Sequence, residues 1–255
     1  MSGPLVIKVG GSTLGSADST YADIATIARD DVPIVVHGGG AEASRWLEAM
    51  GIASRFENGL RVTDEAALPV IVAVYAGLVN KRIVAAINAA GGLAAGLCGA
   101  DACLVECDRS NPELGFVGNP REVHRGVLDA LRAARIVPVI GPIGFTREDT
   151  GLQLVNVNAD TIAGAVAAEV GASEAVFLTD VEGVRGADGT VAERLTVSAA
   201  ERLIEQGVAS GGMIPKLRAC IATAKLGVPA RILDGRQPGA LLDRQRRGTV
   251  VSAGT

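Results

Sequence analysis

Short apolar runs alternate with longer helical stretches along almost all of the 255 residues of this chain. Parallel strands need a crossover between them, and a helix usually supplies it, so this alternation favours a parallel sheet. We therefore expect an α/β fold with a mostly parallel central sheet and helices on both faces. The expected strands are residues 5–9, 33–37, 94–98, 137–140, 175–178 and 230–233.

The clearest helix signal covers residues 199–206. Ser198 is the expected N-cap, Glu201 completes a capping box and Gly207 ends the helix. Between residues 99 and 120 the alternation gives way to short β segments and turns, 101–106 and 115–118, which indicate a hairpin. Because nothing later in the chain resembles a linker, we expect a single domain over residues 1–255 with approximate lobes 1–157 and 158–255.

A long helix is expected over residues 64–90, with Thr63 as its cap. It is apolar on nearly every side, and a helix without a polar face must be buried all round. Val70, Ile71, Val74, Leu78 and Ile83 would then be covered partly by the sheet and partly by a second copy of the chain. The pattern predicts a homodimer through this helix, and burial inside one larger monomer is the alternative.

Charge and composition limit the classes of partner. The net charge is −4 and the basic residues are scattered, which argues against nucleic acid and favours a small-molecule ligand. The N-terminus lacks a basic region leading into an apolar stretch, and the longest apolar run, 66–79, is 14 residues long and contains Pro69. We expect a cytoplasmic protein that does not contact a membrane. The four cysteines do not match zinc-ligand spacing and are expected to be buried thiols.

Two glycine-rich turns follow apolar strands near the start of the chain. Residues 5–9 lead into Gly10-Gly11, and residues 33–37 lead into Gly38-Gly39-Gly40. Consecutive glycines let a ligand approach bare backbone, so several N–H groups can point at one anion. Lys8 lies within the first strand, where an ammonium group needs a negative partner, and we expect it to face a ligand. His37 is expected to support this site rather than to catalyse.

Known nucleotide-binding motifs exclude some classes of enzyme and leave others open. The chain contains no GxxxxGK[ST] motif and no protein-kinase motifs. Residues 38–43 match a loose dinucleotide-binding pattern, with Glu57 at a tolerable distance, which leaves an oxidoreductase open. Four further segments place polar groups at strand ends or helix starts: GLRVT at 59–63, NVNAD at 156–160, LTDVEGV at 178–184 and SGGMIPK at 210–216.

In this order, with KVGGS, VHGGG and LGFVG, these motifs resemble the amino-acid kinase family over nearly the whole chain, and within it the N-acetylglutamate kinases. The resemblance implies a single three-layer αβα sandwich, with an N-terminal lobe for the amino acid and dimerisation and a C-terminal lobe for ATP. It also implies ATP-dependent phosphoryl transfer to the side-chain carboxylate of N-acetyl-L-glutamate in arginine biosynthesis. Magnesium would enter bound to ATP, so no dedicated protein metal site is expected.

The resemblance also assigns roles to residues. Lys8 and Lys216 would be catalytic and would flank the transferring phosphoryl group, and Asp160 would accept from both ammonium groups. Residues implied to bind the amino-acid substrate are Gly39, Gly40, Arg61 and Asn156. Those implied to bind the nucleotide are Gly10, Gly11, Asp180, Val181, Gly183, Val184, Ser210 and Gly211.

Alternatives remain at each level. Lys8 could extend from an edge strand to solvent, Asp160 could only cap a helix, and Arg61 could form only a surface ion pair. Residues 41–45 and 98–102 depart from the usual family pattern, which affects the substrate pocket. The protein could instead phosphorylate aminoadipate on an acidic carrier protein, or be a nucleotide-binding regulator without turnover.

Overall fold

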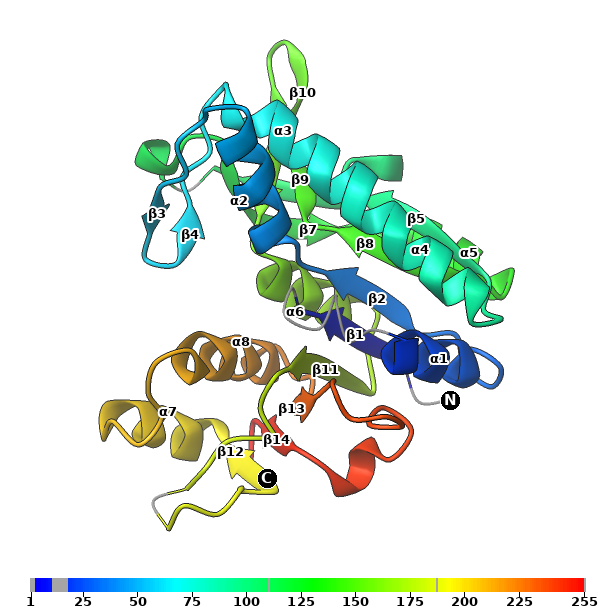
Figure 1. The fold of residues 1–255 in the computed structure, drawn as a ribbon, viewed down its shortest axis with the longest axis vertical. Coiled ribbons are helices and arrows are strands. Elements are labelled where there is room, and N and C mark those ends of the chain that lie inside the picture. Colours follow the sequence, from blue (N-terminus) through cyan, green and yellow to red (C-terminus); the bar gives the residue numbers. More distant parts are fainter. Residues whose placement is uncertain (1–2, 11–17, 110, 187, 255) are drawn as a thin grey trace.

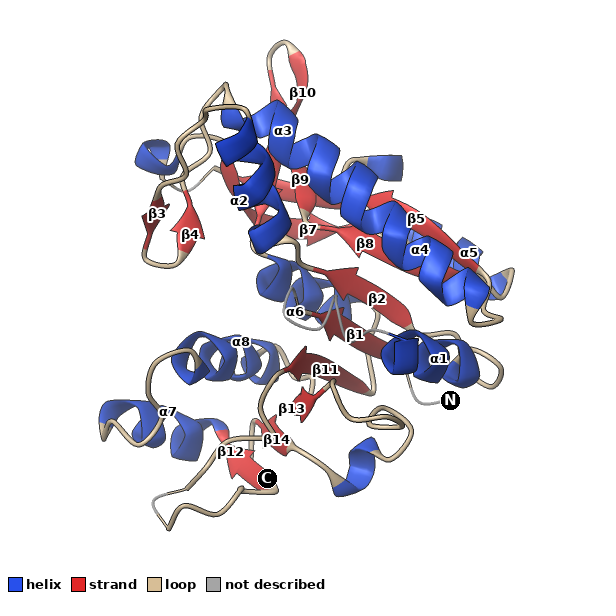
Figure 2. Ribbon diagram, in the orientation of Figure 1, coloured by secondary structure: helices blue, strands red, loops and turns tan. Residues whose placement is uncertain are grey.

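An eight-stranded sheet forms the centre of the protein in our computed structural model, which describes residues 3–10, 18–109, 111–186 and 188–254 (Figures 1 and 2). Its strand order is β12-β14-β13-β11-β1-β2-β8-β5, and every neighbouring pair is parallel except β13 and β14. The strands are β1 (Leu5–Val9), β2 (Ile34–His37), β5 (Ala94–Cys98), β8 (Val137–Gly141), β11 (Glu174–Thr179), β12 (Arg194–Thr196), β13 (Ala230–Asp234) and β14 (Thr249–Ser252). The six strands expected from the sequence are all present.

Helices cover both faces of the sheet, which confirms the expected α/β sandwich (Figure 2). One face packs against α1 (Asp18–Ile27), α2 (Gly40–Ala49), α3 (Ala67–Val72), the π-helical η2 (Ala73–Val79) and α4 (Asn80–Ala89). The other packs against α5 (Gly126–Ala133), α6 (Ala159–Glu169), α7 (Val197–Glu205) and α8 (Met213–Lys225).

Side chains alternate between the two faces of each central strand, as the pleat requires. In β1, Ile7 belongs to the core on the α1–α4 face, whereas Val6 belongs to the core on the α6–α8 face. Lys8 is two residues beyond Val6 and therefore projects on the same face as α6. This parity places the one charged side chain of β1 against the start of that helix.

The long apolar helix exists, and α3, η2 and α4 form one helical run over residues 67–89. Its first turn is capped by Asp64, whose Oδ1 accepts from the Ala67 N–H at 2.8 Å. The expected cap Thr63 instead donates its hydroxyl to the Arg61 carbonyl, because its backbone pairs with Gly115 in a β-bridge. This run is long and apolar enough to cross a membrane, but the core helices of soluble proteins meet the same criterion of length and composition. In its 18-residue apolar stretch, 44% is buried inside the protein.

A second small sheet was only partly anticipated. The hairpin expected between residues 99 and 120 forms from β6 (Val105–Asp108) and β7 (Val117–Val123). They join β9 (Ile143–Glu148) and β10 (Gly151–Val157) in a closed four-stranded unit. A two-stranded hairpin of β3 (Phe56–Glu57) and β4 (Leu60–Arg61) projects from the same end of the molecule (Figure 1).

The capping box predicted for the helix at 199–206 is wrong. Helix α7 begins at Val197, and Thr196 is its N-cap because the Thr196 hydroxyl accepts from the Ala199 N–H at 3.1 Å. Ser198 therefore lies inside the first turn, where its hydroxyl is 3.1 Å from that of Thr196. Both hydroxyls suit an N-cap, and the short strand β12 determines which one is used, because it ends at Thr196.

Candidate functional site

The ends of three adjacent parallel strands and the starts of two helices meet at one cavity of about 190 Å³. Strands β1, β2 and β8 bring Lys8, the Gly38 turn and Pro142 to it, as expected for the carboxyl ends of a parallel sheet. The N-termini of α2 and α6 also line the cavity, through Gly40 and Asp160. A helix N-terminus carries N–H groups without intrahelical partners and a positive dipole end, so the cavity suits an anion.

Lys8 is held by Asp160 in this first cavity. Its Nζ lies 2.6 Å from Asp160 Oδ1, and the two side chains are 16% and 26% exposed. Asp160 is not the capping residue of α6, because Asn158 Oδ1 accepts from the N–H groups of Asp160 and Thr161 at 2.8 and 3.2 Å. The Asp160 carboxylate is thus free to bind the ammonium group. Neither the solvent-exposed lysine nor the capping acid considered as alternatives describes this pair.

Arg61 is buried, not a surface residue, and its guanidinium group is fixed from several sides. Its Nη2 donates to the Gly40 carbonyl at 2.9 Å and to the Ser44 hydroxyl at 2.7 Å, and its Nη1 donates to Ser54 at 2.6 Å. Phe56 of the β3–β4 hairpin covers the group, with 4.5 Å between the guanidinium carbon and the ring centroid.

The guanidinium group has five N–H donors, and the three hydrogen bonds above use three of them. No described residue accepts from the buried Nε of Arg61, and the arginine lines the first cavity. The positive charge of this guanidinium group at the cavity wall suits a ligand carboxylate. Ser44 also gives a function to the departure from the family pattern at residues 41–45, since its hydroxyl supports Arg61.

Asn156 is tied to the same arginine through the backbone. Its amide nitrogen donates to the Thr63 hydroxyl at 3.0 Å, and that hydroxyl donates to the Arg61 carbonyl at 3.0 Å. Strand β10 therefore fixes the segment that carries Arg61, although the two residues lie far apart in the sequence. Asn156 is buried and also lines the cavity.

Tyr75 is a cavity residue that the sequence motifs did not reveal. It lines the first cavity from η2, and a Cβ atom placed on Gly39 would come within 3.0 Å of two atoms of its ring. A larger residue at position 39 would therefore press against the ring of Tyr75, which favours glycine here. Burial raises the pKa of Tyr75, and the nearby Arg61 opposes this, so the phenol is neutral at ordinary pH.

A second cavity of about 480 Å³ lies in the C-terminal part of the chain. Five of the expected nucleotide-binding residues line it. Four of them, Asp180, Val181, Gly183 and Val184, are in the turn after β11, and the fifth is Ser210. A Cβ on Gly183 would lie 2.6 Å from Val191 and 2.7 Å from Thr249, so this turn can only pack with glycine. The remaining expected residues, Gly211 and Gly10, follow α7 and β1 respectively, and Gly11 lies outside the described residues.

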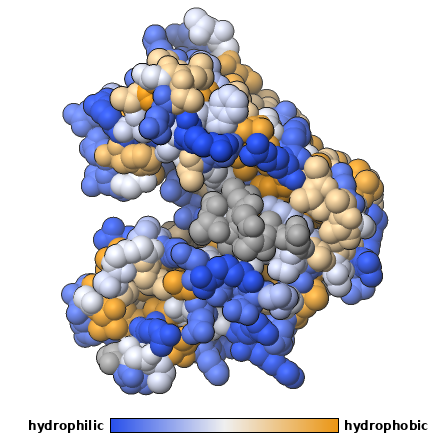
Figure 3. Space-filling model, in the orientation of Figure 1, coloured by the Kyte–Doolittle hydropathy of each residue, from blue (hydrophilic) through white to orange (hydrophobic). Residues whose placement is uncertain are grey.

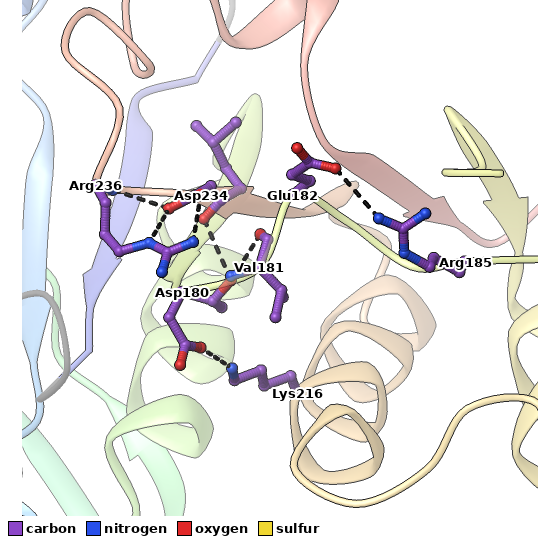
Figure 4. Close-up of polar contacts among 9 residues, drawn as sticks. Asp180, Val181, Glu182, Arg185, Lys216, Asp234 and Arg236 are labelled. Atoms are coloured by element: carbon purple, nitrogen blue, oxygen red, sulfur yellow. Dashed lines mark hydrogen bonds and ion pairs between the residues drawn. The ribbon is translucent and has the colours of Figure 1, made fainter. Parts of the chain in front are cut away.

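Charged side chains around this second cavity are already paired (Figure 4). Lys216 donates to Asp180 Oδ1 at 2.6 Å, and Arg236 forms a two-bond pair with Asp234 at 2.8 and 2.9 Å. The hydrogen bond from Lys216 lowers the pKa of the Asp180 carboxyl. Arg236 and Asp234 were missed from the sequence, because the DGR triplet at 234–236 was not among the motifs considered.

The structure therefore separates two of the expected catalytic groups. Asp160 contacts Lys8, but Lys216 contacts Asp180 instead, so the expectation that Asp160 accepts from both lysines does not describe this conformation. A deep notch between the upper and lower parts of the molecule is visible in Figure 3. Lys216 lies in α8, and its partner Asp180 directly follows β11, so both belong to the C-terminal part of the chain.

Comparison with known proteins identifies the family of the chain. The family model described as "Amino acid kinase family" matches residues 3–234. An acetylglutamate kinase of Dinoroseobacter shibae is 47% identical, covering 93% of this chain and 84% of the relative, and one of Dehalococcoides mccartyi is 41% identical, covering 96% and 91%. The fold is also that of a carbamate kinase from Giardia lamblia bound to AMP-PNP, with a TM-score of 0.74, 18% identity and coverage of 99% of both chains. The match of the family model over most of the chain and the identity to these relatives show that the chain belongs to the amino acid kinase family.

Proposed function

We propose that this protein transfers the γ-phosphoryl group of ATP to the side-chain carboxylate of N-acetyl-L-glutamate and so forms an acyl phosphate for arginine biosynthesis. The identity of 41–47% to acetylglutamate kinases over most of the chain supports this substrate. The observation that carries the proposal is the first cavity, in which Arg61 and the Lys8–Asp160 pair are both lining groups. An acidic amino acid derivative has two carboxylates, one for Arg61 and one for the Lys8 side of the cavity.

We propose that the two carboxylates of the substrate have different partners. Arg61 lines the cavity and is rigidly held, so we assign it the α-carboxylate, which does not react. The side-chain carboxylate then lies toward Lys8 and the start of α6, where the phosphoryl group arrives. A substrate shorter by one methylene would fill one end of the cavity and leave the other with an unpaired charge.

The reaction needs no general base, because a carboxylate is already ionised at neutral pH. The protein must instead overcome the repulsion between a carboxylate and a polyphosphate, and fixed positive groups with aligned N–H donors do so. Lys8, held at 2.6 Å by Asp160, would neutralise the equatorial oxygens of the phosphoryl group in a loose transition state. The N–H groups of Gly39 and Gly40 would add donors at the start of α2.

The second cavity would hold ATP. It is large enough for much of a nucleotide, and its glycine turn at 180–184 follows a strand end. Magnesium would be carried by the polyphosphate and would neutralise part of its charge. The described carboxylates of this cavity, Asp180, Glu182 and Asp234, are each paired with a cationic side chain, which fits an ion brought by the nucleotide better than a protein cage.

Lys216 would exchange its partner when the nucleotide binds. The Lys216 and Asp180 side chains are 28% and 46% exposed, and an ion pair this exposed is worth only about 0–1 kcal/mol. The charge of a polyphosphate can therefore displace Asp180. Closure of the notch between the lobes, approximately 1–157 and 158–255, would bring Lys216 to the phosphoryl group opposite Lys8 (Figure 3).

We also propose a cytoplasmic homodimer formed through the helical run 67–89. Of the apolar residues expected to need covering, Val70, Ile71, Val74 and Ile83 are buried within one chain, and Leu78 is half-buried. The support is the outer side of the run, where small and apolar residues remain exposed or half-buried: Pro69, Val72, Ala73 and Ala76. A uniformly small apolar surface lets two such helices approach closely.

Light scattering tests the dimer. Ala73→Glu should shift the mass of the purified protein from a dimer to a monomer, because it places a charge at the centre of that surface. Ala49→Glu, at an exposed position of α2, is the matched control and should leave the mass unchanged. A wild-type protein that is monomeric, or a dimer unaffected by Ala73→Glu, would contradict the proposed interface.

The activity is tested by trapping its product. The protein is incubated with MgATP, hydroxylamine and one of four acceptors: N-acetylglutamate, N-acetylaspartate, N-acetylaminoadipate or free glutamate. We expect hydroxamate from N-acetylglutamate at a rate well above the other three. Preferential reaction of the aminoadipate derivative would assign the substrate to the longer chain, and ATP binding without any hydroxamate would indicate a regulator and refute the proposal.

A further inference from the structure

A buried polar network lies directly beneath the Gly38–Gly40 turn. It joins His37 at the end of β2 to Asn80 at the start of α4, and both residues are 0% exposed. His37 Nδ1 lies 2.7 Å from the Gly38 carbonyl, and His37 Nε2 lies 3.1 Å from the Asn80 side-chain nitrogen. The proposed reaction leaves both residues without a direct role, because neither lines the cavity.

The partners of these atoms determine where the protons are. A carbonyl can only accept, so Nδ1 of His37 must carry the hydrogen and Nε2 must be an acceptor. Other contacts also orient the amide of Asn80. Its oxygen accepts from Lys81 Nζ at 3.0 Å, and its nitrogen donates to the Val139 carbonyl at 2.9 Å. The Leu97 carbonyl lies 3.3 Å from the same nitrogen, so its two hydrogens are shared between these carbonyls and His37 Nε2. Rotating this amide would set its oxygen against the Val139 carbonyl.

The imidazole ring is also held neutral. Burial lowers the pKa of His37 to about 4, and the charge of Lys81 acts in the same direction. Lys81 is the charged group beside the network. On its other side the His37 ring and the Tyr75 carbonyl both lie close to Gly141, because a Cβ atom placed on that glycine would come within 3.3 Å of each. At neutral pH the ring therefore has one proton, and Asn80 selects the nitrogen that carries it.

This proton controls a peptide group of the cavity. The Gly38 carbonyl and the Gly39 N–H belong to the same planar trans peptide and point in opposite directions. Holding the carbonyl on the buried imidazole therefore turns the Gly39 N–H away from the protein interior. No described residue accepts from that N–H, and Gly38, Gly39 and Gly40 all line the cavity.

We propose that Asn80 is a positioning residue of the phosphoryl-transfer site: it holds His37 in the Nδ1–H tautomer, and His37 in turn aims the Gly39 N–H at the anionic ligand. The inference rests on the proposed function for the identity of that ligand. The tautomer itself does not depend on any substrate, so it can be tested separately.

Nitrogen NMR of the histidine rings tests the tautomer in the wild-type protein. The chain has two histidines, so His124→Gln assigns the spectrum by removing the other one. We expect a protonated Nδ1 and an unprotonated Nε2 for His37, unchanged between about pH 5 and 8. An Nε2–H tautomer, or a ring that titrates in this range, would overturn the proposal whatever the substrate is.

Two substitutions of His37 separate the donor from packing. His37→Asn keeps an N–H close to the position of Nδ1, whereas His37→Phe fills the space without a donor. We expect His37→Phe to lower kcat by about 10- to 100-fold, less than full removal of a fixed donor, with a smaller change in KM for ATP. His37→Asn should recover a large part of that loss. Equal kcat for wild type and His37→Phe would overturn the proposal.

Asn80→Asp gives a signature that a purely structural role would not produce. A carboxylate cannot donate to Nε2, so the ring must either change tautomer or become protonated. We expect kcat to be retained at low pH, where an imidazolium still donates from Nδ1, and to fall as the pH rises through the new pKa of His37. A pH profile identical to that of wild type would contradict the role of Asn80.

If the Asn80→Asp variant does not fold, the NMR measurement and the two His37 variants decide. A wild-type protein without turnover refutes the proposed function, while the NMR tautomer still supports or overturns the network.

Discussion

Replacing Lys8 with methionine should reduce kcat by at least about 100-fold. The Lys8 side chain is 16% exposed and its ammonium group lies 2.6 Å from Asp160, so the charge acts in a partly desolvated site. A unit charge about 4 Å from a phosphoryl oxygen is worth ~4 kcal/mol at an effective dielectric constant of about 20. Loss of one fixed donor costs about 3–4 kcal/mol in measured cases, and ~3 kcal/mol corresponds to a factor of more than 100 in rate.

The effect should also depend on Asp160 in a defined way. Without Lys8, the Asp160 carboxylate faces the incoming phosphoryl group as a bare like charge. The double variant Lys8→Met/Asp160→Asn should therefore turn over faster than Lys8→Met alone, which is a coupling of opposite sign to that of two independent losses. Lys225→Met is the matched control, because Lys225 forms an ion pair of 2.7 Å with Glu201 at the surface.

The assay is steady-state release of ADP with saturating MgATP and N-acetylglutamate, together with thermal unfolding to exclude misfolding. If Lys8→Met keeps kcat within about threefold of wild type, the electrostatic argument is wrong. If the double variant is slower than Lys8→Met, Asp160 has a role other than holding the ammonium group.

The contacts of individual side chains give three further predictions. Arg61→Lys should raise KM for N-acetylglutamate about 10- to 100-fold through loss of charged hydrogen bonds, whereas Arg45→Lys, at an exposed arginine of α2, should leave KM unchanged in the same kinetic assay. Lys216→Met should lower kcat about 100-fold yet change the free energy of unfolding by no more than about 1 kcal/mol, because its ion pair is exposed; denaturant titration would contradict this with a larger loss. Because burial lowers the pKa of His37 from 6.5 to about 4, the unfolded chain binds this proton more tightly, and stability should fall by about 3 kcal/mol as the pH drops between these values; His37→Phe should lack this component in denaturant titrations, and an identical pH slope would refute it.

Much of the fold could be predicted because short segments of the sequence are enough to indicate the strands and helices. Each central strand is an apolar run of ordinary length, and glycines directly follow β1 and β2 at the carboxyl ends of these strands. The burial of Lys8 within β1 required an acidic partner, and Asp160 supplies it. These inferences need only neighbouring residues and the pleat of a strand.

Other features depend on contacts between distant segments, which one sequence does not reveal. Tyr75 and Asn80 lie in an apolar helix and read as ordinary core residues until β2 and the Gly38 turn are placed beside them. The small sheet needed the pairing of β6 with β9, two short strands separated by almost forty residues. The partner of Lys216 is Asp180, which follows a distant strand, and no motif in the sequence indicates this pairing.

The most direct test is a crystal structure with MgADP, aluminium fluoride as a mimic of the transferring phosphoryl group, and N-acetylglutamate. The account predicts that the ammonium groups of Lys8 and Lys216 both lie within hydrogen-bond distance of the mimic, with Asp160 still on Lys8 and the Asp180 pair broken. A closed complex in which Lys216 remains on Asp180, or in which Lys8 faces away from the mimic, would contradict it.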